Sequence, residues 1–337
     1  MNVLIFGAGA IGSHIAYCMY KTGHVVNLVC RGKHYVNIRD NGLIVQINNN
    51  EKLESEALIK QCSEFNVVDN INKVNDVEYS YVFITVKLSS YNEDTLRELQ
   101  PYMGKETAVI TPCTKMPFWW FYNLKNSKYK DIDFDHSISK FFYKENIIMM
   151  TMWLSAVIKE PGHIVIKHTQ RGYPLCHVHS KMEKPANKLR SIFNETCISP
   201  IVENIRSEIY IKSINSLAFN VVALDREFDN LQLSQNQKSV EEIRTILQEG
   251  EQILNKLNLP IVQNIDDRIR QTLSSKNHTM SMLHDYQNGK QVELSYIWDG
   301  FCKICNVLDI NMSFTKAVVE RVLYKVNSNL DNDKDLS

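Results

Sequence analysis

The chain has 337 residues, of which 44% are hydrophobic and 23% are charged, and its 38 Lys and Arg residues balance 38 Asp and Glu residues. This composition predicts a soluble globular protein of about two domains. Zero net charge argues against a nucleic-acid partner or a membrane surface, and no apolar run approaches the length of a membrane span. The eight cysteines are scattered, which suits reduced thiols and a cytoplasmic protein. Cys302 and Cys305 lack a second ligand pair, so we expect no metal site.

The first twelve residues carry the most informative motif. The apolar run 3–6 predicts a buried parallel strand, and Gly7, Gly9 and Gly12 then form G-x-G-x-x-G at the start of an amphipathic segment. Such glycines allow a tight turn, a close backbone approach to a pyrophosphate and close helix–strand packing, while the helix N-terminus faces the phosphates. The motif therefore predicts a dinucleotide site, with a turn that serves only packing as the alternative. The candidate cofactor-binding residues here are Gly7, Ala8, Gly9, Ala10, Ile11 and Gly12.

The residues after the second predicted strand, 25–30, indicate which dinucleotide is bound. An NAD site usually has an acidic residue at the end of this strand to hold the ribose 2′-hydroxyl. No acid lies between His24 and Ile38, and the strand runs instead into Arg31-Gly32-Lys33-His34. A guanidinium grips a 2′-phosphate with paired hydrogen bonds. We therefore expect NADP(H) as the cofactor, with Arg31 at the phosphate; a solvated basic turn is the alternative.

The rest of the first half alternates strands and helices, as parallel βαβ units do. Strands are expected at 81–86 and 108–111, with a helix at 93–100 between them. Since ligands lie at the carboxyl ends of parallel strands, Lys87 and the segment 112–115 belong on the cofactor side. From 146 to 179, β-branched segments around Glu160-Pro161-Gly162 predict an extension of the same sheet.

The second half is helical in pattern. The expected helices are 202–224, 238–256, 264–275, 291–307 and 313–326. We expect a dinucleotide-binding domain at 1–198, a helical substrate domain at 199–327 and a polar, disordered tail at 328–337. Many dehydrogenases of two such domains bind substrate in the cleft between them.

Several segments in order resemble the ketopantoate reductase family, over nearly the whole chain. The matching segments are the glycine motif with Arg31-Gly32, Val-Phe-Ile-Thr-Val-Lys at 82–87, Glu-Pro-Gly-His at 160–163, Lys-Ser-Ile-Asn-Ser-Leu-Ala-Phe-Asn at 212–220, Ser-Met-Leu-His-Asp at 281–285 and Val-Glu-Leu-Ser-Tyr-Ile-Trp-Asp-Gly at 292–300. The resemblance implies an α/β Rossmann-type domain followed by an all-α domain like that of 6-phosphogluconate dehydrogenase. It also implies NADPH-dependent reduction of 2-dehydropantoate (ketopantoate) to pantoate, a step of pantothenate and coenzyme A biosynthesis.

The resemblance also implies roles for individual residues. Lys212 would be the catalytic proton donor, because an ammonium can stabilise the charge that develops on a 2-keto oxygen and then protonate it. Glu293 would be a second catalytic residue, closing the site around the cofactor or the substrate hydroxyl, and Ser281 would bind the substrate carboxylate; either could instead cap a helix. Lys87 would lie near the ribose and nicotinamide. Asn230 is a weaker match to a further substrate-binding asparagine.

The spacing of Lys212, Ser216 and Asn220 puts these three polar side chains along one helix face. All three are therefore candidate substrate-binding residues, with a solvated helix face as the alternative.

Three departures from the family pattern leave the substrate open. Thr114 stands where the family has a cofactor-contacting asparagine, Lys115 replaces a glycine, and Ser216 replaces an asparagine. Threonine keeps a hydroxyl but loses the paired donor and acceptor of the amide. The expected partner is a small 2-keto acid; the alternatives are reduction of a different keto acid and a non-catalytic NADP-binding protein. A homodimer is possible.

Overall fold

The computed structural model describes residues 1–337 apart from 50–51, 113, 125–126, 277 and 335–337. The chain divides into two compact units, the first comprising Met1–Cys113 with Phe118–Ile205 and the second Thr114–Pro117 with Arg206–Ser337. The division falls seven residues after the predicted boundary at 198, and four residues of the first half belong with the helical unit. Among the described residues, no helix combines the length and apolar character needed to cross a membrane.

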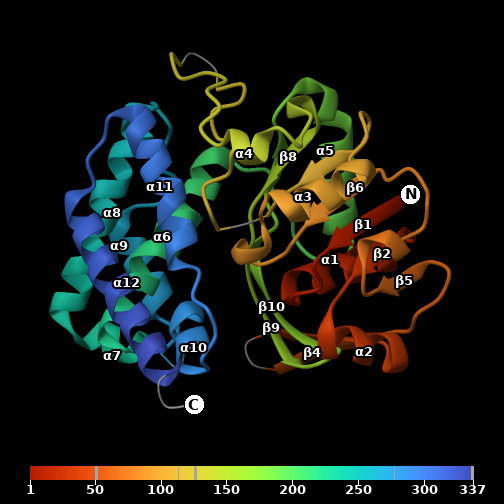
Figure 1. Cartoon of the computed structure of the whole chain (residues 1–337), viewed down its shortest axis with the longest axis horizontal. Coiled ribbons are helices and arrows are strands. Elements are labelled where there is room, and N and C mark those ends of the chain that lie inside the picture. Colours follow the sequence, from red (N-terminus) through yellow and green to blue (C-terminus); the bar gives the residue numbers. More distant parts are fainter. Residues whose placement is uncertain (50–51, 113, 125–126, 277, 335–337) are drawn as a thin grey trace. The chain divides into compact units, whose positions relative to one another are not determined.

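A seven-stranded sheet forms the centre of the first unit (Figure 1). Its strands, in spatial order, are β11 (Leu175–His177), β8 (Ile147–Met150), β7 (Ala108–Ile110), β6 (Tyr81–Ile84), β1 (Asn2–Phe6), β2 (Val25–Val29) and β5 (Phe65–Val68). Every neighbouring pair is parallel except β11 with β8. The strands predicted at 3–6, 25–30, 81–86 and 108–111 are confirmed. They are short and apolar because helices cover both faces of a parallel sheet.

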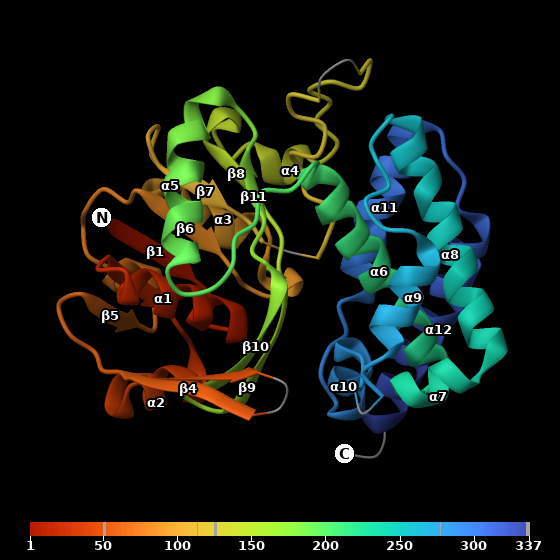
Figure 2. The same cartoon turned by 180° about the vertical axis from the view of Figure 1, so that it is seen from behind.

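The helices of this unit cover the sheet from both sides, with α5 on one face and α3 on the other (Figures 1 and 2). They are α1 (Ala10–Lys21), α2 (Gly32–Asn41), α3 (Glu93–Leu99), α4 (His136–Ser139) and α5 (Glu183–Asn194). Phe193 of α5 packs edge-on against Phe83 of β6, with ring centroids 6.4 Å apart. Gly23 has a φ of +78° and lies in the turn after α1.

A second sheet of four strands corrects one expectation. Its order is β4 (Lys52–Ile59), β3 (Leu43–Asn49), β10 (His163–Gly172) and β9 (Trp153–Glu160). The segment 146–179 therefore does not simply extend the first sheet: β8 and β11 do, whereas β9 and β10 form a hairpin that pairs with β3. Parallel pairing of β10 with β3 joins residues more than a hundred positions apart, which local periodicity does not reveal.

The second unit is all-helical. Its helices are α6 (Ile205–Arg226), α7 (Asn230–Gln235), α8 (Gln237–Lys256), α9 (Ile265–Leu273), α10 (Ser281–Gln287), α11 (Leu294–Leu308) and α12 (Ser313–Lys334). The five predicted helices are confirmed, with ends within a few residues of those predicted except for the C-terminal end of α12. The short helices α7 and α10 were not expected, because each has too few turns to show a periodic pattern.

The C-terminal end of α12 differs from the expected disordered tail. The helix continues to Lys334, so only 335–337 of the segment 328–337 lie outside the described residues. Adding residues to a helix that is already packed avoids the cost of nucleation, which explains how a polar sequence extends it. Buried Val319, Val322 and Val326 anchor the preceding turns.

Candidate functional site

The glycine motif lies where the strand order of the seven-stranded sheet reverses. β1 has β2 on one side and β6 on the other, and the chain visits β2 and β5 before it crosses to β6. In open α/β sheets, ligands bind at this switch point, outside the carboxyl ends of the strands. The turn that joins β1 to α1 is fixed to both neighbours: Gly7 N–H donates to Val29 O at 3.1 Å, and Thr85 N–H donates to Phe6 O at 2.9 Å.

The three glycines of the motif have three different surroundings. Gly7 has a φ of +109°, and a Cβ there would lie 2.8 Å from Thr85 C and Val86 N. A Cβ on Gly12 would lie 1.9 Å from Gly7 O, so this glycine lets α1 pack against the end of β1. Gly9 has no atom within 4 Å of its Cβ position, which leaves open space beside the backbone at the start of α1. That combination is the one expected of a turn that accepts a pyrophosphate.

Two hydroxyl side chains that the sequence analysis missed hold this turn. Thr85 Oγ1 donates to Gly7 O at 2.6 Å, and Ser13 Oγ donates to Ala8 O at 3.2 Å. Both hydroxyls bond to backbone carbonyls of the turn and so hold its conformation. Sequence gives no specific signal for either residue, because their value lies in contacts across the fold.

Arg31 begins α2 as its N-terminal cap residue, and its carbonyl accepts the Tyr35 N–H at 3.4 Å. Its side chain is exposed and forms no ion pair with any residue that the structure describes. Gly32 has a φ of +62° with nothing within 4 Å of its Cβ position, so backbone conformation alone requires glycine there. Lys87 is exposed and lies three residues after the carboxyl end of β6.

On α6 of the second unit, the predicted polar residues differ in exposure. Lys212 and Ser216 are partly exposed, whereas Asn220 is only 4% exposed. The Asn220 amide donates to Ser216 O at 2.8 Å and accepts the Met282 N–H at 3.0 Å. Ser281 Oγ also contacts Asn220 Oδ1, at 3.5 Å. Asn220 therefore joins the lysine helix to the start of α10, and this brings two separate predicted motifs together.

The structure also bears on the helix-capping alternative for Ser281 and Glu293. Ser281 is the first residue of α10 and Glu293 is the cap residue of α11, yet neither side chain caps its helix. Asn230 is fully buried; its side chain donates to Thr272 O at 2.8 Å and its backbone N–H donates to His278 O at 3.1 Å. These bonds connect α7 to α9 and to the loop before α10.

His278 was not singled out by the sequence, and it lies near the predicted catalytic lysine. Partial desolvation, and then the positive charge of Lys212, lower the pKa of His278. A neutral imidazole beside the ammonium adds no second positive charge. The backbone N–H of Asn230 holds the His278 carbonyl, which joins the start of α7 to the loop that carries this imidazole.

The segment that departs from the family pattern packs within the helical unit. Lys115 Nζ lies 3.8 Å from Asp299 Oδ2, and a Cβ on Gly300 would lie 3.2 Å from Met116 Cβ. Thr114 belongs to the same short segment, Thr114–Pro117. Lys115 stands where the family carries a glycine, and its ammonium has an acidic neighbour, Asp299, on α11.

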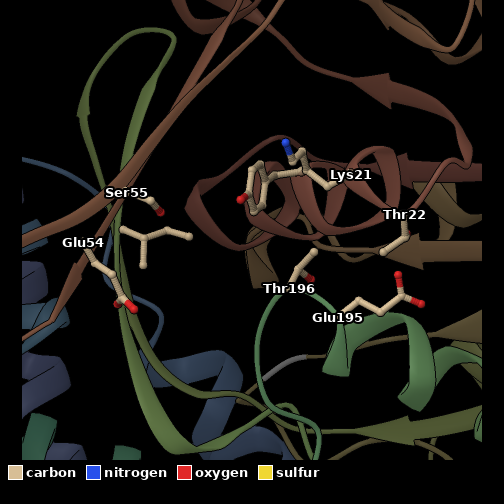
Figure 3. Close-up of a pocket in the computed structure, with 8 residues that line it drawn as sticks. Lys21, Thr22, Glu54, Ser55, Glu195 and Thr196 are labelled. Atoms are coloured by element: carbon tan, nitrogen blue, oxygen red, sulfur yellow. The ribbon is translucent and has the colours of Figure 1, made fainter.

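The first unit also has a pocket of about 290 Å³ (Figure 3). Its lining includes Lys21, Thr22, Glu54, Ser55, Glu195 and Thr196. Lys21 is the last residue of α1, roughly 16 Å along the axis from the N-terminus of the helix that faces the glycine turn. The pocket is unsuitable for a pyrophosphate, because two carboxylates line it and because it lies at the C-terminal end of α1.

Comparison with known proteins gives the same family for both units. The family model described as ketopantoate reductase PanE/ApbA matches residues 3–112, and the model of that family's C-terminal region matches 204–325. The 2-dehydropantoate 2-reductase of Mesorhizobium japonicum is 23% identical over 317 residues, which cover 92% of this chain and 93% of the relative. That of Pyrococcus horikoshii is 22% identical and covers 88% of each chain.

Solved structures share the fold. The 2-dehydropantoate 2-reductase of Geobacter metallireducens has a TM-score of 0.74 at 15% identity, covering 96% of this chain and 99% of its own. A D-mandelate dehydrogenase solved with NADH and anilino(oxo)acetate has a TM-score of 0.74 at 21% identity, and the match covers 97% of this chain and 99% of the dehydrogenase. The α/β unit with its glycine turn, the helical unit with its lysine helix, and the two family models lead to one conclusion: this chain belongs to the ketopantoate reductase family of oxidoreductases.

Proposed function

We propose that this protein reduces 2-dehydropantoate to pantoate with NADPH as the hydride source. The observation that carries the proposal is the buried Asn220 amide, which joins the helix of Lys212 to the start of α10. Residues that the family resemblance selects from two distant segments, Lys212 and Ser281, are thereby linked through one side chain. The curated relatives that span most of the chain, named 2-dehydropantoate 2-reductases, support the same activity.

The first unit supplies the residues for the cofactor. When bound, NADPH provides the hydride for reduction of the carbonyl carbon. The N–H groups at the start of α1 and the open space at Gly9 suit its pyrophosphate, and the exposed Arg31 guanidinium suits its 2′-phosphate. An acidic residue at the end of β2 would repel that phosphate, and Arg31 occupies this place instead. We assign Ala8, Ala10, Ile11, Lys87, Thr114 and Glu293 to the cofactor as well, on the family resemblance.

The second unit supplies the residues for the keto acid. The Lys212 ammonium stabilises the negative charge that develops on the carbonyl oxygen and donates the proton that completes the alcohol. Ser281 donates its hydroxyl to the substrate carboxylate, while Ser216 lies one turn from Lys212 on the same helix face. We expect Asn220 to act by holding the start of α10 through the Met282 N–H, and Asn230 by holding α9 through Thr272 O, because their side-chain amides are engaged with these backbone groups.

Reduction of a different 2-keto acid is the second candidate function. The ion pair of Lys115 with Asp299 and the hydroxyl of Thr114 replace the family's asparagine and glycine. The D-mandelate dehydrogenase of the same fold was solved with anilino(oxo)acetate, an aryl-substituted 2-oxo acid derivative. Activity restricted to aromatic or branched acids, with none on 2-dehydropantoate, would favour this candidate.

We place the enzyme in the cytoplasm on its cysteine usage.

The test is a comparison of Lys212→Ala with a matched control, Lys316→Ala. Lys316 lies on α12 in an exposed ion pair with Glu320, where loss of charge changes stability by less than about 1 kcal/mol. We expect Lys212→Ala to lower kcat by roughly 10²–10⁴-fold with the Kd for NADPH unchanged within about twofold, and Lys316→Ala to retain activity. Equal turnover by Lys212→Ala and wild type would refute the assignment of the proton donor.

The oligomeric state is a further part of the proposal. The ketopantoate reductase of Staphylococcus aureus is described as dimeric. We propose a homodimer for this chain as well, which sedimentation velocity at micromolar concentration would test directly.

A further inference from the structure

We propose that His34 is a positioning residue that fixes two segments of the first unit at once: α2 with Arg31, and the glycine turn. One ring nitrogen ties α2, which begins at Arg31, to the Pro161-Gly162 turn between β9 and β10. The other ties the glycine turn, through Ser13. The inference rests on the proposed dinucleotide site and extends it to residues that neither the motif nor the family resemblance assigns.

The hydrogen bonds around His34 determine which ring nitrogen carries the proton. The Gly162 N–H donates to His34 Nδ1 at 2.8 Å, so Nδ1 is an acceptor. In the neutral ring, Nε2 then carries the hydrogen and donates to Ser13 Oγ at 3.4 Å. The Ser13 hydroxyl in turn donates to Ala8 O at 3.2 Å. A continuous chain of donors and acceptors thus runs from the β9–β10 turn to the glycine motif.

Gly162 offers α2 a rigid docking point. It has a φ of +82°, and a Cβ there would lie 2.4 Å from Asn37 Oδ1 on α2, so only glycine allows this approach. Its carbonyl accepts the Ile44 N–H of β3 at 2.8 Å. The Pro161-Gly162 segment therefore has a further physical role: it is the surface against which α2 is placed.

The position of α2 matters because its first residues hold Arg31. Arg31 is exposed and pairs with no residue that the structure describes, so its backbone and the orientation of α2 set where the guanidinium can reach. His34 is one turn along the same helix. Burial lowers the pKa of His34 and keeps the ring in the neutral form that this arrangement uses.

The two bonds of His34 predict two separable effects on binding. The Gly162 bond acts on α2 and Arg31, so its loss should weaken NADPH, which has a 2′-phosphate, more than NADH. The Ser13 bond acts on the glycine turn, which holds the pyrophosphate common to both cofactors. Its loss should weaken NADPH and NADH by the same factor.

Three variants and two ligands test this assignment. In His34→Asn, the amide oxygen can replace Nδ1 as the acceptor for Gly162 but cannot reach Ser13. His34→Phe removes both bonds of His34. Ser13→Ala removes the bond with His34 Nε2 and the link to Ala8, and leaves the Gly162 bond in place. Kd values for NADPH and NADH are measured by fluorescence titration of the whole protein, and thermal unfolding reports the folded fraction.

We expect His34→Phe to lower the NADPH-to-NADH preference about tenfold, and His34→Asn to keep the preference near wild type. Ser13→Ala should raise both Kd values about equally, by roughly threefold. If His34→Phe does not fold, His34→Ala replaces it, because it also removes both bonds of His34 and should lower the preference by the same factor. Wild-type protein that prefers NADPH, together with a folded His34→Phe of unchanged preference, would overturn this inference alone. Wild-type protein that binds neither cofactor would overturn the dinucleotide site and the inference with it.

Discussion

Two similar substitutions in the glycine turn should affect different properties: one should lower stability and the other should weaken NADPH binding. In Gly12→Ala, the new Cβ would lie 1.9 Å from Gly7 O and 2.5 Å from Thr85 Oγ1, against ordinary contacts that begin near 3.4 Å. The start of α1 must therefore move by roughly 1.5 Å, because Gly7 O belongs to the backbone. Overpacking of this kind costs about 1–3 kcal/mol, and loss of the Thr85–Gly7 hydrogen bond adds about 1 kcal/mol.

The total of about 2–4 kcal/mol corresponds to a fall in Tm of roughly 5–15 °C for a unit of about 200 residues. Gly9→Ala is the matched control. Its φ is −64° and nothing lies within 4 Å of the new Cβ, so we expect its free energy of unfolding to change by less than about 0.5 kcal/mol. The methyl group would nevertheless occupy the space proposed for the pyrophosphate, and the Kd for NADPH should rise at least about tenfold.

Differential scanning calorimetry and NADPH titration on both variants give the comparison. Gly12→Ala should lose stability, while Gly9→Ala should lose binding and keep stability. A Gly9→Ala protein that binds NADPH like wild type would refute the placement of the cofactor. A Gly12→Ala protein with an unchanged Tm would refute the packing argument.

Three further predictions concern one side chain of the second unit, Asn220, and two of the first unit, Thr85 and His34. Asn220→Ala leaves the buried Met282 N–H without its acceptor, so urea unfolding should show a loss of about 1–3 kcal/mol and the KM for the keto acid should rise; an unchanged KM would separate Asn220 from the site. Thr85→Val keeps the side-chain shape but loses the bond to Gly7 O, and the Kd for NADPH should rise about fivefold, for about 1 kcal/mol; equal Kd values would contradict the role of the hydroxyl. Burial lowers the pKa of His34 below its ordinary 6.5, so its contribution to stability is present above that pH and is lost as pH falls through the lower folded pKa. Between about pH 7.5 and about pH 5.5, the free energy of unfolding should therefore fall less for His34→Asn than for wild type. Equal falls would show that His34 does not contribute to the pH dependence of stability.

Local sequence predicted the parts of this fold that depend on local patterns. The strand before Gly7, the helix that contains Gly12 and the long helices of the second unit follow from apolar periodicity and glycine placement. β3 and β4 were not predicted, because β4 is largely exposed and polar and the hairpin is stabilised by pairing of β3 with the distant β10. Sequence alone could not separate β9 and β10 from the first sheet for the same reason.

The candidate site shows the same division. Gly7, Gly9, Gly12 and Arg31 are visible from spacing and chemistry, since each acts within its own segment. Thr85, Ser13 and His34 are ordinary residues in sequence, and their roles depend on carbonyls and N–H groups that the fold brings to them. Asn220 was predicted as a substrate ligand from its helix face, and the structure shows its amide engaged with the backbone of α6 and α10.

The central claim is reduction of a 2-keto acid with NADPH. The most direct test follows the absorbance of the reduced nicotinamide when purified protein is mixed with 2-dehydropantoate, and with a small panel of other 2-keto acids, using NADPH and then NADH. We predict rapid oxidation of NADPH with 2-dehydropantoate and a much slower reaction with NADH. Oxidation of neither cofactor with any of the acids, by protein that is folded and binds NADPH, would contradict the claim.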